Sequence, residues 1–196
     1  MPRPIEFDRE HALRDAMQLF WRQGYHKTSV RDLTEATRLQ PGSLYGAFRN
    51  KRSLFLHSLD YYSDALQASV DQVLRSNAPP LERIHRFFDH LLNEAARDPQ
   101  EKGCLLVNTL LETPAEDREI LQRAATALGY VEKTFVEVLE EAKRAGDLEP
   151  ERDSEAQARL LMAGIFGLRV YAKMQPPPGA LSAIVETLLA NLKKGA

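Results

Sequence analysis

Residues 28–55 read TSVRDLTEATRLQPGSLYGAFRNKRSLF and contain two short amphipathic segments on either side of a tight connection. The spacing of apolar residues predicts helices over about 29–36 and 41–47. A longer apolar stripe predicts a preceding helix over about 8–23. A long helix followed by two short ones joined by a four-residue turn predicts a helix-turn-helix unit.

The same pattern separates an inner face of this unit from an outer one. The residues expected in its core are Phe20, Val30, Leu33, Ala36, Leu39, Leu44 and Phe48. This assignment leaves the start of the third helix exposed, together with Tyr45 and Arg49. A helix presented in this way can enter the major groove of DNA with its first residues against base edges.

The distribution of charge along the chain supports this expectation. The 196 residues carry a net charge of −2, which by itself suggests no polyanionic partner. Residues 1–52, however, have a net charge of +4, and the remainder has −6. The basic residues available to collect phosphates are Arg22, Lys27, Arg31, Arg38, Arg49, Lys51 and Arg52. An ordinary three-helix bundle with a solvated basic face explains the same pattern, so charge alone leaves both possibilities open.

Residue types and spacing over about residues 10–55 resemble the N-terminal domain of the TetR family of transcriptional regulators. The resemblance is carried by residues 28–33 and 42–55 and by the stretch from Ala16 to Tyr25. It implies that the third helix is the recognition helix and that Thr28, Tyr45 and Lys51 contact the DNA backbone. It places four residues nearest the bases: Gln40, Pro41, Gly42 and Ser43.

Two positions depart from the pattern of the family. Arg38 stands in the turn where the family usually has glycine, so a left-handed backbone there would be strained. Gln40 stands where serine or threonine often caps the third helix.

Beyond this unit the apolar period remains helical, so we expect an all-α protein of about nine helices. The six further helices are expected at about 51–76, 80–97, 102–112, 115–145, 152–174 and 179–194. We expect a break between helices at Asp98-Pro99, and we expect the seventh helix to begin at Thr113-Pro114, with the threonine as its cap. We expect a DNA-binding domain over residues 1–52 and a helical domain for effector binding and dimerisation over residues 53–196.

The last two helices of this second domain are candidates for a homodimer interface. The segment from Leu160 to Tyr171 is apolar on nearly all sides, and its small residues permit close helix approach. The predicted interface residues are Ala163, Gly164, Gly167, Leu181, Val185, Leu188 and Leu192. The alternative is that both helices bury these residues against their own chain.

Cys104 is the only cysteine, which excludes an internal disulfide and favours a reducing cytoplasm. It lies in a Gly-Cys-Leu stretch that resembles one in a branch of the family where, in some members, this cysteine senses oxidants or electrophiles. We expect it in the first turn of a helix, where the helix dipole and the nearby Lys102 favour a thiolate. The other interpretation, which we prefer, is a small buried apolar side chain.

The rest of the sequence suggests no catalytic or metal chemistry. His85 and His90 lie on different helix faces, and no cysteine cluster, phosphate-binding glycine loop or nucleophile motif occurs. No apolar stretch is long enough to span a membrane. We expect no cofactor, a double-stranded DNA operator and a small-molecule effector as partners, and repression as the family's usual mode. A helical enzyme that uses carboxylates or Cys104 is the alternative.

Overall fold

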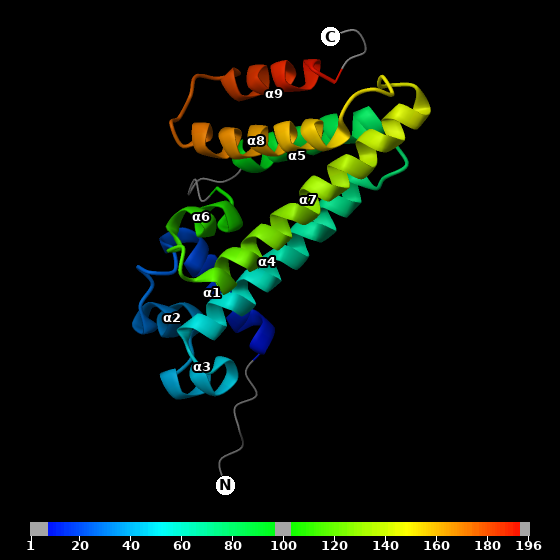
Figure 1. Cartoon of the computed structure of the whole chain (residues 1–196). Coiled ribbons are helices and arrows are strands. Elements are labelled where there is room, and N and C mark those ends of the chain that lie inside the picture. The colour runs from blue at the N-terminus through cyan, green and yellow to red at the C-terminus, as the bar shows by residue number, and fades with distance from the viewer. Residues whose placement is uncertain (1–7, 97–102, 193–196) are drawn as a thin grey trace. The chain divides into compact units, whose positions relative to one another are not determined.

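The computed structural model describes residues 8–96 and 103–192. All regular structure in these residues is helical, which confirms the predicted all-α fold with nine helices (Figure 1). The helices are α1 Arg9–Gln23, α2 Val30–Thr37, α3 Pro41–Phe48, α4 Lys51–Leu74, α5 Pro80–Ala96, α6 Leu105–Glu112, α7 Arg118–Ala145, α8 Ser154–Ala172 and α9 Ala180–Ala190. Among the described residues, no helix combines the length and apolar character needed to cross a membrane.

The described residues form two compact units. The first contains residues 8–65 and 104–125, and the second contains residues 66–96, 103 and 126–192. Helices α4 and α7 contribute to both. The first unit includes more of the chain than the predicted DNA-binding domain of residues 1–52, because α6 and the start of α7 pack with the helix-turn-helix.

An aromatic cluster holds α1 against α4 in the first unit. The ring of Phe20, which is fully buried, meets the edge of Phe55 with centroids 5.0 Å apart. Tyr25 lies against the other side of this pair, 4.7 Å from Phe55. Such pairs add to the stabilisation that the burial of aromatic surface already gives. The cluster fixes the helix on which the two short helices rest.

Four of the predicted core residues of the helix-turn-helix are fully buried, namely Phe20, Leu33, Leu44 and Phe48. Val30 was expected among them, but 39% of it is exposed. The reason is its position as the first residue of α2, one turn before the buried stripe of that helix begins.

The second unit has an aromatic core of its own. Phe87 meets Phe135 edge to face with centroids 5.1 Å apart, and Phe88 lies beside both. Polar contacts join α4 to α7 in the same unit, where the Tyr130 hydroxyl donates to Asp71 Oδ1 at 2.7 Å. This bond lowers the pKa of the Asp71 carboxyl.

Most helix ends follow the sequence signals. Gly24 ends α1 with a left-handed φ of 79°, and its N–H donates to Phe20 O. One prediction was wrong: Thr113 caps the C-terminal end of α6, and α7 begins only at Arg118. Residues 114–117 form a turn instead, in which the Asp117 N–H donates to the Pro114 carbonyl. The predicted break at Asp98-Pro99 lies outside the described residues.

Candidate nucleic-acid interface

Helix α2 is fixed at its start by a reciprocal pair of bonds. The Ser29 hydroxyl accepts from the Asp32 N–H, and the Asp32 carboxylate accepts from the Ser29 N–H at 2.7 Å. These bonds satisfy N–H groups that a helix start leaves without partners. They also lower the pKa of the Asp32 carboxyl. Ser29 is therefore the N-cap of α2.

The turn that follows α2 has a left-handed residue at Arg38. Its φ of 56° and ψ of 27° are left-handed, which is the case in which a residue other than glycine is strained. An L-residue pays about 1 kcal/mol or more for this conformation. The Arg38 side chain is exposed and has no acidic partner among the described residues. The residue with the strained backbone, Arg38, is thus an exposed cation beside the start of α3.

Helix α3 presents an uncapped, exposed first turn. Pro41 is its first residue, and the Gln40 side chain makes no capping bond. Residues 40–43 are all exposed, and the next N–H, that of Leu44, already bonds to the Gln40 carbonyl. The N–H groups of Gly42 and Ser43 therefore point out at the positive end of the helix dipole, which is an arrangement that attracts anions.

The opposite side of α3 is anchored in the core. Leu44 and Phe48 are fully buried, and the guanidinium of Arg9 lies 4.8 Å from the Phe48 ring centroid. Tyr45 stands between the two faces, half-buried, and burial raises the pKa of its hydroxyl. A protonated tyrosine hydroxyl at the edge of the core can donate to a phosphate.

Lys51 is the first residue of α4 and is tied to the aromatic cluster. Its Nζ lies 4.5 Å from the centroid of the Tyr25 ring. Burial lowers the pKa of this ammonium group, although Asp32 acts in the opposite direction. The cation–π contact holds the charge in one place without using its N–H donors, so it stays able to bind an oxyanion.

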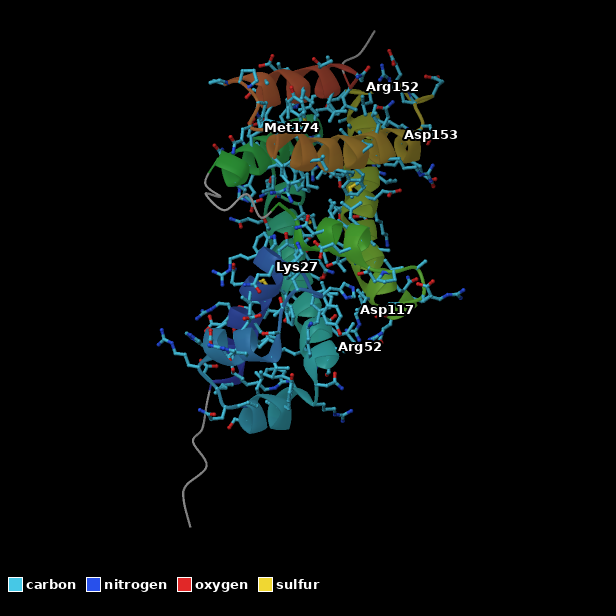
Figure 2. All side chains as sticks on the ribbon, turned by 90° about the vertical axis from the view of Figure 1, so that its left-hand side faces the viewer. Lys27, Arg52, Asp117, Arg152, Asp153 and Met174 are labelled. Atoms are coloured by element: carbon cyan, nitrogen blue, oxygen red, sulfur yellow. The ribbon has the colours of Figure 1, made fainter. Side chains whose placement is uncertain are left out.

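The seven basic residues named from the sequence do not share one environment. Arg52 donates to Asp117 at 2.6 Å and to Glu119 at 3.0 Å, so it ties α4 to the chain around the start of α7 (Figure 2). Arg31 pairs with Glu35 at 2.8 Å, but its side chain is 86% exposed. An exposed pair of this kind is worth about 0–1 kcal/mol and exchanges readily for a phosphate. Arg31 thus remains available to DNA, whereas Arg52 is occupied.

Thr28 lies differently from what the resemblance implied. It is 1% exposed, and its hydroxyl donates to the Gly24 carbonyl at 2.7 Å. The hydroxyl therefore holds the connection between α1 and α2 together and is not presented to a phosphate.

Cys104 is the residue immediately before α6 and not part of its first turn. It is 8% exposed, and the Tyr62 hydroxyl donates to its Sγ at 3.7 Å. The Tyr62 ring in turn meets Trp21 of α1 edge to face at 5.0 Å. The thiol is packed one side chain away from the helix that supports the helix-turn-helix.

The predicted dimer residues divide into two sets. Val185 and Leu192 are buried within their own chain, and Gly164 faces Leu188 so closely that a Cβ would lie 2.3 Å from Leu188 Cδ2. The Gly164–Leu188 contact packs α8 against α9, which is the alternative kept open above, and Leu181 lines a pocket of the second unit. Ala163 and Gly167, in contrast, are exposed.

The contacts that join α6 and the start of α7 to the helix-turn-helix were not predicted from the sequence. A Cβ on Gly24 would overlap the Glu112 carboxylate, so the end of α6 reaches the end of α1. The Arg52–Asp117 pair joins residues 65 positions apart. A contact over such a separation leaves no local pattern in the sequence.

A helix-turn-helix with an exposed, uncapped α3 and accessible cations around it defines a DNA-binding regulator. Comparison with known proteins agrees. Residues 12–57 match the model of bacterial regulatory proteins of the tetR family, and residues 80–188 match the tetracyclin repressor-like C-terminal domain. The chain belongs to the TetR family of DNA-binding transcriptional regulators.

Individual relatives resemble the chain over nearly its whole length. It is 30% identical over 172 residues to the HTH-type transcriptional repressor ComR of Escherichia coli, covering 87% of this chain and 82% of ComR. It is 31% identical over 194 residues to the regulator YezE of Bacillus subtilis, covering 98% and 100%. A solved cysteine mutant of the TetR family regulator CifR, in complex with 26-base-pair operator DNA, superimposes with a TM-score of 0.87 at 32% identity, covering 96% and 98%.

Proposed function

We propose that the protein represses transcription in the cytoplasm as a homodimer and leaves its operator when a small-molecule effector binds. The observation that carries this proposal is the exposed first turn of α3, with the N–H groups of Gly42 and Ser43 unused by the helix and accessible cations beside it. Two such helices in a two-fold dimer suit paired half-sites about 34–36 Å apart. The protein acts by binding, without turning over a substrate.

In this proposal α3 reads the operator with its first turn. Gln40, Pro41, Gly42 and Ser43 lie against base edges in the major groove. Arg31, Tyr45 and Lys51 hold the phosphates on either side. Their donors are supported by the exposure of Arg31, by the protonated Tyr45 hydroxyl, and by the fixed Lys51 ammonium.

Fluorescence anisotropy with labelled operator fragments tests these contacts. Lys51→Ala and Tyr45→Phe should weaken binding by a similar factor on every fragment, because phosphates carry no sequence information. Lys51→Ala should also reduce the slope of log affinity against log salt by about 1 per protomer. Lys133→Ala, an exposed lysine in the second unit, is the matched control. Unchanged affinity in both variants contradicts the assignment.

The proposed dimer uses the faces of α8 and α9 that their own chain leaves uncovered. On α8 the exposed apolar positions Leu160, Ala163, Gly167 and Val170 recur at steps of three and four residues. Leu160 is 43% exposed and Val170 is 53% exposed, and Ile184 of α9 is 38% exposed. This spacing is typical of a helix that packs against another helix, and small residues at the centre allow close approach.

Sedimentation velocity tests the dimer. Ala163→Arg should give monomers and a large loss of operator affinity, because one charge per protomer would be buried in the interface. Ala125→Arg places the same charge on an exposed alanine of α7 and should leave the dimer intact. A dimer that survives Ala163→Arg rules out this face.

The effector is expected to act on the conformation that spaces the two α3 helices. Cys104 is a second candidate trigger, although its burial favours a packing role. Because the chain has one cysteine and one tryptophan, N-ethylmaleimide would modify Cys104 alone, and Trp21 fluorescence would report on the packing of Tyr62. Full modification with unchanged operator binding excludes the sensor, and Cys104→Ala treated with the same reagent is the control.

A further inference from the structure

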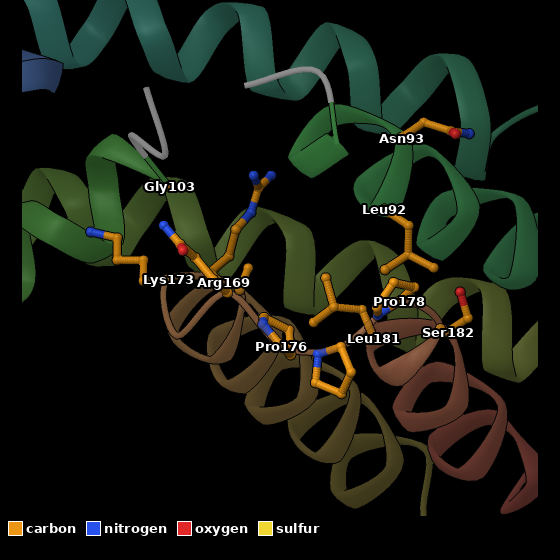
Figure 3. A pocket seen from close by; sticks show the side chains of 13 residues that line it. Leu92, Asn93, Gly103, Arg169, Lys173, Pro176, Pro178, Leu181 and Ser182 are labelled. Carbon is orange, nitrogen blue, oxygen red and sulfur yellow. The ribbon is translucent and has the colours of Figure 1, made fainter. Parts of the chain in front are cut away.

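The second unit contains a pocket whose walls come from α5, α8 and α9. Its volume is about 560 Å³, and the connection between α8 and α9 closes one side of it (Figure 3). This volume lies in the range of pockets that hold small organic molecules. The pocket is therefore large enough for an effector.

Part of the wall is apolar. Leu92 of α5, Pro178 of the connection and Leu181 of α9 gather on one side of the pocket in Figure 3. The prolines at 176–178 give this wall a stiff backbone, since each fixes its own φ. An apolar chain placed against these residues would be removed from water at little cost in protein order.

The other part of the wall carries a guanidinium that lacks one acceptor. Arg169 of α8 is 17% exposed, and its Nη2 donates to Glu94 Oε2 at 3.0 Å. Its Nε–H is buried and has no acceptor among the described residues. A buried donor without a partner costs free energy that an incoming acceptor would recover.

A second cation stands on the same side. Lys173 follows Arg169 by four residues, so both side chains rise from one face of the end of α8, as Figure 3 shows. Lys173 is exposed and has no acidic partner in the part of the chain that the structure describes. The N-terminal end of α9 opens on the same pocket, with Gly179 at the cap position and no side-chain capping bond. All three features favour a negative group.

We propose that this pocket binds a small amphipathic carboxylate. One carboxylate oxygen accepts from Arg169 Nε, Lys173 neutralises the charge, and the apolar chain lies against Leu92, Pro178 and Leu181. This proposal gives the chemical class of the effector. It rests on the proposed function only in the claim that effector binding changes the affinity for DNA.

The charges favour a monoanion over a phosphate. Among the described residues, Arg169 and Lys173 bring two positive charges to the pocket, and Glu94 pairs with Arg169, which leaves a single positive charge for the ligand. A phosphate group carries up to two charges and would be left partly uncompensated beside Glu94. A single carboxylate with an apolar tail matches both the charge and the apolar wall.

Isothermal titration calorimetry of the full chain without DNA tests the proposal. The probes are hexanoate, octanoate and benzoate, with octan-1-ol as a neutral match for octanoate. At least one carboxylate should bind, and octanol should bind at least about tenfold more weakly than octanoate. Arg169→Met and Lys173→Met should each weaken carboxylate binding by about tenfold. Arg159→Met, on the exposed face of α8 and outside the pocket, should change nothing.

Lys173→Met keeps the test decisive if loss of Arg169 impairs folding, because Lys173 is exposed. The proposal is overturned if none of the three carboxylates binds, if octanol binds as well as octanoate, or if carboxylates bind Lys173→Met as well as the wild type. A failure of DNA binding, measured separately, would count against the proposed function and leave this result standing.

Discussion

Arg38→Gly should make the protein more stable and at the same time a weaker DNA binder. Arg38 has a φ of 56° and a ψ of 27°, which glycine adopts without penalty and arginine does not. The left-handed conformation costs an L-residue about 1–2 kcal/mol. Against this gain, the greater conformational freedom of glycine in the unfolded chain lowers the stability of the variant by about 0.4–1 kcal/mol. The net gain is about 0.5–1 kcal/mol, or roughly 1–4 °C in Tm for a chain of this size.

The loss in DNA affinity comes from the missing charge. Arg38 is exposed beside the first turn of α3 and has no acidic partner among the described residues. If it contacts one phosphate per half-site, its removal should reduce the slope of log affinity against log salt by about 0.9 per protomer. Thermal denaturation and fluorescence anisotropy at about 50–200 mM salt measure the two effects.

Two further substitutions separate backbone from charge. Arg38→Asn tolerates the left-handed conformation better than arginine but lacks the charge, so it should weaken DNA binding as Arg38→Gly does. Arg38→Lys keeps the charge and should keep most of the affinity. The reasoning is refuted if Arg38→Gly lowers Tm, or if it raises Tm and binds DNA with unchanged affinity and salt dependence.

Three more predictions concern the support of the helix-turn-helix. Asp32→Ala should lower Tm at neutral pH. Hydrogen bonds from Ser29 hold the pKa of the Asp32 carboxyl below its usual value, so the difference in Tm from wild type should vanish as the pH falls through that pKa. A difference in Tm that persists in acid would contradict the capping role. Phe20→Ala should lower the free energy of unfolding, measured by urea denaturation, by about 3–5 kcal/mol, because the ring is fully buried in the aromatic cluster. A decrease below about 1 kcal/mol would mean that neighbouring side chains fill the cavity. Gly24→Ala should cost more than about 1 kcal/mol, since φ is 79° and the new Cβ would meet Glu112; an unchanged urea midpoint would show that both can relax.

Much of the fold could be predicted because its signals are local. The apolar period of each helix depends on residues within one or two turns of each other. The position of the turn at Arg38 was predictable for the same reason, since the resemblance over contiguous positions placed Arg38 where the family usually has glycine.

The parts that could not be predicted depend on how helices are rotated against each other. A helix apolar on nearly all sides does not reveal which face its own chain covers, so Val185 and Ala163 could not be separated before the structure. The direction of the Thr28 hydroxyl and the capture of Arg52 by Asp117 are likewise set by packing across distant segments. The same holds for Arg169 and Lys173, whose pocket needs three helices from separate parts of the chain.

The central claim is that two copies of α3 read a two-fold symmetric operator. Selection of fragments bound from genomic DNA by the full-length protein tests it most directly. The account predicts enrichment of one palindromic sequence whose half-site centres lie about one helical turn, or a multiple of it, apart. Recovery of fragments with no common sequence, or of a single half-site without symmetry, would contradict it.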